Sequence, residues 1–427
     1  MSTTGNSAVN PAAGSAASPG ASPGATAAIQ LPPAARSHVG MRLTAAAALG
    51  RFELQVCANC QAVQYPPREA CHRCLSSRLV WRLQSGEGEL ISATTLHHSH
   101  LEYFRARVPW RIGLVRLHSG PSVIAHLHGD VPAPPTAVNV MIGLDKAGQG
   151  VLVAVPAGSA VEMSSDRQLS EMTCDPRGRT LLVTAGATPA GHELVRALLG
   201  AGAASVWVGH QEGDSAETLA ELVRLPGVRL LPLDVTDARS VDAAAALLGP
   251  TLDILVNNSG VRPVAGGGAA GAAPAAAGAA AGGPAAATGN DLRIDVDAAR
   301  TEMDASYFGL LNLARGFVPL LRGRGIAWVN ILSVLALCNF PALGTYSAAE
   351  AAAWSLSQWL RAHLQPTGVR VLNVFPGPIA PGELAAATVA ALRASVEDSY
   401  PGEFAQQWLA RWLESPKVLE RELAAGR

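Results

Sequence analysis

The sequence predicts two folded units: a small zinc-binding and all-β unit, followed by an α/β unit with a doubly wound parallel sheet. Three observations predict this architecture. Two Cys-x-x-Cys pairs occur before residue 75, short strand patterns fill residues 80–155, and from Gly178 onward strand patterns alternate with helical ones. Alternating β and α segments indicate a parallel sheet with helices on both faces. A chain of 427 residues has room for two or three domains.

The composition argues against several classes of protein. The formal net charge is -1, so the whole chain has no electrostatic preference for nucleic acid or an anionic membrane. The N-terminus lacks the basic start and apolar core of a signal peptide. Two uncharged runs, 1–35 and 263–290, are too rich in Ala, Gly, Ser and Pro to insert into a bilayer. Six cysteines, four of them in paired motifs, do not read as a secreted disulfide framework. We therefore expect a cytoplasmic protein without membrane association.

Two low-complexity segments are predicted not to fold. Residues 1–36 are almost entirely Ala, Gly, Ser, Pro and Thr, and residues 265–289 hold only Ala, Gly and Pro besides one threonine. Such segments cannot bury enough apolar surface to offset the entropy lost on ordering. We expect a disordered N-terminal tail, a first domain over 45–158, a polar linker, and a second domain over 178–420 that contains a flexible insert.

The paired cysteines predict a structural zinc site. Cys57 and Cys60 are followed, after ten residues, by Cys71 and Cys74. Two such turns offer four thiolates, which suit tetrahedral zinc in a closed site with no open position for catalysis. Two redox dithiols are the alternative, but the βαβ context of such motifs is missing here. His72, inside the second turn, is expected to be exposed and not a ligand.

Six strand patterns follow the zinc turns, and Gly-rich turns separate them. They cover residues 80–83, 88–96, 111–117, 122–127, 139–143 and 151–155. Short strands with this spacing predict a small closed barrel. Together with the Pro66-Pro67-Arg68 stretch between the zinc turns, this part resembles the zinc-ribbon and OB-fold family associated with acyl-CoA enzymes, over about residues 45–158. The resemblance implies a thiolase-like partner and an acyl-CoA or steroid-CoA substrate nearby.

OB folds also bind single strands, so nucleic acid is an alternative ligand. Such binding needs a basic groove with stacking aromatic residues. Residues 51–155 hold ten Lys or Arg against seven Asp or Glu, which is a small excess. The one local cluster, residues 103–111, is interpreted as a solvated loop, with a partner surface or a CoA phosphate contact as the alternative. His97, His98 and His100 are expected on the surface. Nucleic-acid binding is therefore the remote alternative.

The second unit has strand patterns joined by helical ones. The strands are predicted at 180–184, 205–209, 229–232, 253–256, 326–332 and 370–375. Several polar motifs stand where strands end, namely Asp234, Asn257-Asn258-Ser259-Gly260, Ser333 and Pro376-Gly377, with Tyr346 in a helical pattern. These motifs resemble the short-chain dehydrogenase/reductase superfamily over about residues 178–420. The resemblance implies an NAD(P)-binding Rossmann domain, 3-hydroxy/3-oxoacyl substrates of lipid or steroid metabolism, and homo-oligomers formed through this domain.

Only half of that family's catalytic set is present. Ser333 and Tyr346 match the serine that orients the carbonyl and the tyrosine that passes the proton. Glu350 stands where the family has a lysine four residues after the tyrosine, and Ser306 stands where it has an asparagine. Residues four apart are neighbours on a helix, and a carboxylate disfavours a nearby phenolate. We expect Glu350 to hinder proton transfer by Tyr346.

The phosphate-binding loop departs from the family as well. In the pattern T-G-x-x-x-G-x-G, which starts here at Thr184, Ala185 and Pro189 replace the first two glycines and Gly191 is the third. The methyl group and the proline ring occupy places where the backbone should approach a pyrophosphate, and proline has no N–H to donate. We therefore predict that NAD or NADP binding is weak or lost.

Two functions remain open after these departures. One is an NAD(P)-dependent oxidoreductase with a degraded catalytic set, and the other is an inactive scaffold that docks a thiolase-like protein. His210 and Gln211 follow the second strand, where the family often has an Arg or Asp that selects the cofactor, so NAD and NADP stay undistinguished. The residues expected to line the cofactor site are Thr184, Gly186, Gly191, Asp234, Asn257, Gly260, Pro376 and Gly377.

Overall fold

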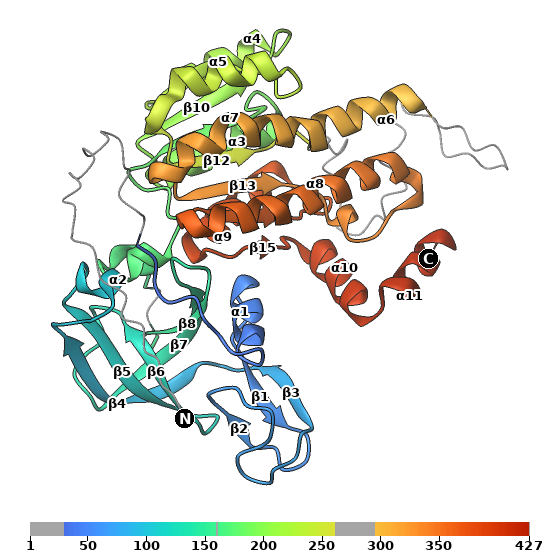
Figure 1. Cartoon of the computed structure of the whole chain (residues 1–427). Helices are drawn as coiled ribbons and strands as arrows, with labels where there is room; N and C mark the ends of the chain where they lie inside the picture. The colour runs from blue at the N-terminus through green and yellow to red at the C-terminus, as the bar shows by residue number, and fades with distance from the viewer. Residues whose placement is uncertain (1–29, 159–160, 261–294, 427) are drawn as a thin grey trace, which may run out of the picture.

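The structure, a computed structural model, describes residues 30–158, 161–260 and 295–426 (Figure 1). The predicted insert and the predicted tail up to residue 29 lie outside the described residues. In the described part of the chain, no helix is long and apolar enough to cross a membrane.

Residues 30–36 were predicted to be part of a disordered tail, but the structure places them against both folded units. Pro32 is buried, and Arg36 Nη2 lies 3.9 Å from the carboxylate of Asp145 in the barrel. Leu31 lies beside Gly368 of the second unit. The few apolar residues at the end of this segment therefore find a surface to cover, which composition alone does not reveal.

The N-terminal unit begins with α1 (Met41–Ala48) and a three-stranded antiparallel sheet of order β2-β1-β3. Its strands are β1 (Glu53–Cys57), β2 (Val63–Gln64) and β3 (Leu79–Leu83). The sequence patterns assigned residues 80–83 to the barrel, whereas they pair with β1 in this zinc-ribbon sheet. Each Cys-x-x-Cys turn therefore sits at one end of a small sheet.

The other five predicted strands form a closed barrel, as expected. The order around it is β4-β5-β6-β8-β7, with β4 (Glu87–Leu96), β5 (Trp110–Leu117), β6 (Ser122–Leu127), β7 (Thr136–Leu144) and β8 (Gly150–Pro156). Alternate residues point inward, so Val115, Leu117, Val123 and Leu127 fill the interior. The fold of the first domain is therefore a zinc ribbon followed by an OB-type barrel.

Residues 103–111 do not form a solvated loop. Tyr103, in the short helix α2 (Glu102–Arg105), is 3% exposed and Trp110 is 1% exposed. The Trp110 indole donates a hydrogen bond to His126 Nδ1 at 2.9 Å. The rings of Tyr103 and Trp110 each pack edge to face with the ring of Phe104. Trp110 and Phe104 belong to a buried cluster on β8, and of the arginines in this segment only Arg105 is exposed.

The predicted polar linker also packs. Met163, Leu169 and Met172 are buried against Trp110 and the outer side of β8. Cys174 is 1% exposed and accepts a hydrogen bond from Ser395 Oγ at 3.4 Å, which is consistent with an inert thiol. Three apolar residues among charged neighbours are enough to fix this segment to the barrel.

The C-terminal unit is a seven-stranded parallel sheet of order β11-β10-β9-β12-β13-β14-β15. The strands are β9 (Thr180–Val183), β10 (Ser205–His210), β11 (Val228–Pro232), β12 (Ile254–Asn257), β13 (Ala327–Ile331), β14 (Arg370–Val374) and the unpredicted β15 (Asp398–Ser399). The helices are α3 (Pro189–Gly200), α4 (Ala216–Val223), α5 (Ala238–Leu248), α6 (Val296–Met303), α7 (Gly309–Arg324), α8 (Gly344–Leu364), α9 (Pro381–Ala394), α10 (Glu403–Glu414) and α11 (Pro416–Ala424).

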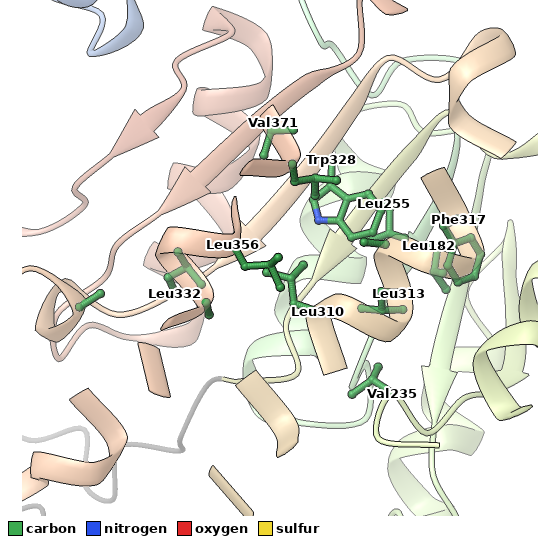
Figure 2. Close-up of a cluster of buried hydrophobic side chains, with 14 of the residues drawn as sticks. Leu182, Val235, Leu255, Leu310, Leu313, Phe317, Trp328, Leu332, Leu356 and Val371 are labelled. Carbon is green, nitrogen blue, oxygen red and sulfur yellow. The ribbon is translucent and has the colours of Figure 1, made fainter. Parts of the chain in front are cut away.

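Successive residues of each strand face opposite sides of this sheet and build two cores. Leu182, Leu255 and Trp328 pack with α5, α7 and α8, and Figure 2 shows this cluster around the Trp328 indole. Val183 and Val256, on the other face, pack with α3 and α9. The doubly wound prediction is therefore confirmed, because the strands are apolar on both faces.

The two units meet through the β7–β8 hairpin. Its tip, residues 145–149, lies against the first residue of β14, Arg370, whose guanidinium donates to the carbonyls of Leu144 and Asp145. Gln365 Nε2 adds a hydrogen bond of 3.1 Å to the carbonyl of Ala147. Because β14 begins at Arg370, the barrel holds the amino ends of the parallel strands and leaves their carboxyl ends to the opposite edge.

Candidate functional site

The four cysteines of the two turns form one cluster. All four Sγ atoms lie within 4.8 Å of one another, and the Cys57–Cys74 and Cys60–Cys71 sulfur pairs are each 3.6 Å apart. Zn–S bonds of about 2.3 Å in a tetrahedron place the sulfurs about 3.8 Å apart. The donor set therefore fits zinc, and it is the one candidate metal centre in the described ranges.

The chain reverses in the same way after each pair of cysteines. Gln61 and Leu75 both have φ of 58°, the left-handed conformation that tight turns use. His72 is exposed, and its Nδ1 lies 3.3 Å from Gln64 Oε1, so it stays outside the cluster as predicted. All four ligand positions around the zinc would be filled by cysteines, which leaves this centre a structural role.

The second candidate site lies where β9 and β12 end side by side. The sheet order reverses between these strands, and such a switch point forms a crevice at the carboxyl edge. The hydroxyl of Thr184, after β9, is the centre of the contacts here. It donates to Asn257 Oδ1 at 3.2 Å, and it accepts from the Asn258 backbone at 2.9 Å and from Ser259 Oγ at 2.7 Å. The predicted residues after both strands are thus brought together.

The phosphate loop keeps its shape without its first two glycines. Ala185 has φ of 47°, a conformation that favours glycine, and Pro189 is the first residue of α3. Gly191 is required, because a Cβ there would lie 2.3 Å from the Ala185 carbonyl oxygen. Its N–H is already bound by the capping hydroxyl of Thr188 at 3.1 Å. The first turn of α3 therefore presents fewer free N–H donors than a pyrophosphate site normally provides.

The charge near this loop is also unsuited to a phosphate. A cleft of about 460 Å³ opens beside it, and its lining includes Pro189, Pro381 and the acidic residues Glu193 and Glu221. His192 lies between the two carboxylates, with ring nitrogens 3.7 and 3.8 Å from them. Two carboxylates against one imidazole give this cleft no net attraction for a pyrophosphate. The residues present do not fit the phosphates of a dinucleotide.

Farther along the crevice, Asp234 is engaged within the protein. Its Oδ1 accepts hydrogen bonds from the Thr236 backbone at 2.9 Å, the Thr236 hydroxyl at 2.7 Å and Gln211 Nε2 at 3.0 Å. The sequence identified Gln211 only as a position that selects the cofactor. In the structure its amide bridges the ends of β10 and β11.

Ser306 and Glu350, which replace the family's asparagine and lysine, bind each other. Ser306 Oγ donates to Glu350 Oε1 at 2.8 Å, from a π-turn (Asp304–Phe308) to the inner face of α8. Gly260 completes the contact, because a Cβ there would lie 2.8 Å from Ser306 Oγ and 3.0 Å from Glu350 Oε1. Ser333 and Tyr346 are both buried at this same edge, and Ser333 Oγ accepts from the Leu335 backbone at 3.2 Å.

Burial changes the charge state of Glu350. Its carboxyl is 1% exposed, and desolvation raises the pKa of Glu350 to about 8, although hydrogen bonds from Ser306 and the Ser333 backbone favour the ionised form. The nearby Glu302 raises the pKa further. The carboxyl is therefore mostly protonated at neutral pH, and the negative charge expected beside Tyr346 is largely absent. The expectation from the sequence assumed an ionised group.

Aromatic side chains cover Gly377 at this edge. Phe404 of α10 packs so closely on Gly377 that a Cβ there would lie 2.4 Å from its ring. Trp408 stacks on Phe404 and meets Phe340 edge to face. The loop after Pro376-Gly377 is short, because α9 already begins at Pro381. Nothing in the sequence indicated that α10 would lie over Gly377.

Comparison with known proteins agrees with this division of the chain. Residues 44–80 match the family described as ChsH2, rubredoxin-like zinc ribbon domain, and residues 81–145 match ChsH2, C-terminal OB-fold domain. Residues 179–391 match the family described as short chain dehydrogenase.

Individual relatives match the C-terminal unit. A short-chain dehydrogenase of Penicillium crustosum is 32% identical over 194 residues, which are 42% of this chain and 62% of that protein. Sulfoacetaldehyde reductase 2 of Chromohalobacter salexigens is 29% identical over 204 residues, 46% of this chain and 71% of that protein. A crystal structure of a Burkholderia cenocepacia short chain dehydrogenase in complex with NADP is 30% identical, with a TM-score of 0.48, and covers 58% of this chain and 98% of that one. The chain spans 59–62% of the first three curated relatives.

Proposed function

A zinc ribbon and an OB fold of the ChsH2 type are joined in this chain to a domain of the short-chain dehydrogenase family, and from this premise we propose a scaffold function. In this proposal the dehydrogenase domain keeps its fold but has lost most or all hydride transfer. The N-terminal domains dock a thiolase-like protein that handles acyl-CoA, and zinc at the four cysteines maintains the docking module.

The hydrogen bond between Ser306 and Glu350 is the observation that favours this function. A short-chain dehydrogenase needs a cation near its tyrosine to favour the phenolate, because a general acid or base works best with a pKa near the working pH. Here a buried carboxyl of raised pKa occupies that place and satisfies the neighbouring hydroxyl. The polar groups of the site bind one another, and neither charge state of Glu350 supplies the missing cation.

Three further contacts along the crevice support the same proposal. In the phosphate loop, the Ala185 methyl group takes up space and Pro189 lacks a backbone N–H. The Gln211 amide donates a hydrogen bond to Asp234, and Phe404 covers Gly377. Each contact replaces an interaction that a dinucleotide or a substrate would otherwise make. Weak or lost binding of NAD and NADP follows from their sum.

A residual oxidoreductase acting on 3-hydroxy/3-oxoacyl thioesters is the second candidate. Ser333 and Tyr346 favour it, since both lie at the carboxyl edge of the sheet where the reaction of this family takes place. In such an enzyme Ser333 would orient the carbonyl and Tyr346 would pass the proton. Without a cation at position 350, we expect the general acid–base contribution of about 10²–10⁴-fold to be mostly lost.

Cofactor titration separates the two candidates. Calorimetry of the full chain with NADH and with NADPH is expected to give weak binding or none, and acetoacetyl-CoA is expected to cause negligible oxidation of either cofactor. The control is the combined Ala185→Gly, Pro189→Gly, Ser306→Asn, Glu350→Lys variant, which restores the family residues. Micromolar affinity of the wild-type protein, together with turnover of about one per second or faster, would refute the scaffold proposal.

Docking has its own test. The tagged wild-type chain is expected to co-purify with a thiolase-like protein from the native host. A tagged Cys60→Ser variant, which lacks one zinc ligand, is expected not to co-purify with it. Tight, salt-sensitive binding of single-stranded DNA by the full chain would instead indicate the nucleic-acid function.

A further inference from the structure

The positive charge of the N-terminal unit is concentrated in its zinc ribbon. Residues 51–85 contain five arginines and two glutamates, whereas residues 86–155 contain five Lys or Arg and five Asp or Glu. Arg51 and Glu53 bind each other at 2.8 Å, so this pair adds no net charge. What remains is Glu69 and four exposed arginines, namely Arg68, Arg73, Arg78 and Arg82. The ribbon, and not the barrel, therefore presents a cationic surface.

Large apolar side chains are exposed in the same stretch. Leu75 is 80% exposed, Leu83 is 62% exposed and Val80 is 40% exposed. Single exposed apolar residues are ordinary on a protein surface, but here three lie within nine residues, and residues 73–83 contain no acidic side chain. We call the exposed side chains of residues 73–83 the ribbon strip. Arginine combined with apolar side chains is typical of protein interfaces.

The ribbon strip lies on an open edge of the molecule. It runs from the second cysteine turn along β3, which is the last strand of its sheet and pairs with β1. Figure 1 shows this sheet at the end of the molecule opposite the parallel sheet. Because side chains alternate along a strand, Val80 and Arg82 are exposed on one face of β3 and Leu83 on the other. A partner can therefore reach the strip from both faces and from the edge.

Leu75 has a backbone conformation that its side chain does not favour. Its φ is 58°, in the left-handed region where glycine and asparagine are usual. Gln61 holds the same place and the same φ in the first cysteine turn. The N–H of Gln61 donates to the carbonyl of Cys57 at 2.9 Å, and the N–H of Leu75 donates to that of Cys71 at 3.0 Å. The turn therefore needs no leucine to fold, and the exposed side chain is available for a contact outside the chain.

We propose that the ribbon strip is the surface through which this chain docks its thiolase-like partner. Leu75 enters an apolar pocket of the partner. Arg73, Arg78 and Arg82 lie against acidic side chains around that pocket. The inference rests on the docking function proposed above and assigns a surface and a charge to it.

Charge and shape select this occupant. Zinc held by four thiolates carries two negative charges, but its sulfurs belong to buried or half-buried cysteines, whereas the arginines are exposed. An approaching partner therefore meets the cations first, and an acidic surface is attracted to them. Nucleic acid fits less well, because the one aromatic residue of the strip, Trp81, is half-buried and offers no free ring for base stacking.

Leu75→Gly tests the strip without damaging the fold. The thiolase-like protein that co-purifies with the wild-type chain is identified by mass spectrometry, purified, and titrated against the full-length chain by biolayer interferometry. Glycine suits the left-handed φ, so Leu75→Gly should keep its zinc and melt at no lower temperature than the wild-type protein. Its affinity for the partner should fall by about tenfold or more. Gln61→Gly makes the corresponding change at the first turn and should alter the affinity by less than about twofold.

Charge reversal tests the arginines. Arg82→Glu changes β3 away from the cysteine turns, so its zinc content should stay that of the wild-type protein. Its affinity should fall by about tenfold, and the association rate should lose most of its dependence on salt. Arg116→Glu changes an exposed arginine of the barrel strand β5, alters the net charge equally, and should leave both quantities near the wild-type values.

The outcomes separate the docking function from its surface. If the wild-type chain captures no thiolase-like protein, the docking function fails and the strip fails with it. If Leu75→Gly and Arg82→Glu bind the partner as tightly as the wild-type chain, docking stands and the strip is refuted. If the full chain binds single-stranded DNA, and Arg82→Glu abolishes this binding while Leu75→Gly does not, the strip is a nucleic-acid surface and the proposal is overturned.

Discussion

The contact between the two units can be tested at Arg370. Its guanidinium is 6% exposed, donates to the carbonyls of Leu144 and Asp145, and lies 4.0 Å from the carboxylate of Glu397. Replacing it by methionine keeps much of the volume but leaves two hairpin carbonyls and part of a buried carboxylate without a partner. We predict a large loss of stability for Arg370→Met.

The size of the loss follows from these contacts. Each buried group left unsatisfied costs about 1–3 kcal/mol, and breaking a buried ion pair costs about 3–5 kcal/mol. These penalties overlap, and Glu397 keeps Arg361 at 3.4 Å as a second cation. We therefore expect a decrease of about 3 kcal/mol in the free energy of unfolding, measured by urea titration of the full chain with tryptophan fluorescence. The barrel and the sheet are also expected to unfold in two steps in this variant.

Arg315→Met is the matched control. Arg315 also binds one carboxylate, Asp242 at 2.8 Å, and one backbone carbonyl, Ala238 at 2.9 Å, but its side chain is 53% exposed. Solvent screens this pair and hydrates the groups that the substitution frees, so we expect a loss below about 1 kcal/mol. Equal effects of the two substitutions would show that burial at the junction does not stabilise the chain, and would refute the reasoning.

Three further predictions concern the zinc centre, Glu350 and the restored site. Elemental analysis is expected to find one zinc ion per wild-type chain and none in Cys60→Ser, whose N-terminal unit should unfold because structural zinc supplies folding free energy. Zinc-free wild-type protein prepared without chelator would contradict this. The pKa of Glu350 is raised to about 8 in the folded state, so the unfolded chain binds fewer protons than the folded chain between about pH 5 and 8. The free energy of unfolding of the wild-type protein should therefore fall across this window by up to about 5 kcal/mol relative to Glu350→Gln. Parallel pH profiles of the two proteins in urea titrations would exclude a buried neutral carboxyl. Glu350→Lys alone should not restore turnover, because the phosphate loop is unchanged, and a steady-state assay with NADPH and acetoacetyl-CoA checks this.

The sequence predicted most elements of the fold because the strands alternate strongly or are continuously apolar. It failed where tertiary contacts decide the outcome. The two residues of β2 give no periodic signal, and residues 80–83 have the same pattern whether they join a ribbon or a barrel. The segment 103–111 mixes arginines with aromatics, so its composition does not reveal that Tyr103 and Trp110 are buried.

The candidate site was predictable in its positions and not in its chemistry. The spacing of Ser306 and Glu350 within known motifs placed both residues at the carboxyl edge. In the structure, Ser306 Oγ lies 2.8 Å from Glu350 Oε1. The protonation of Glu350 depends on burial by segments far away in the sequence, which periodicity does not report. The contact of Phe404 with Gly377 depends likewise on where α10 packs after β15.

The β7–β8 hairpin has a consequence for how such a chain can have evolved. Domains connected only by a tether can be exchanged one for another, since neither depends on the surface of its neighbour. Here the carbonyls of the hairpin tip and the guanidinium of Arg370 complete each other, so a different barrel would leave a buried cation without these two acceptors. Among chains that share this fusion, substitutions at residues 144–149 are therefore expected to accompany substitutions at the first residue of β14. These positions are also expected to change less often than the rest of the barrel surface.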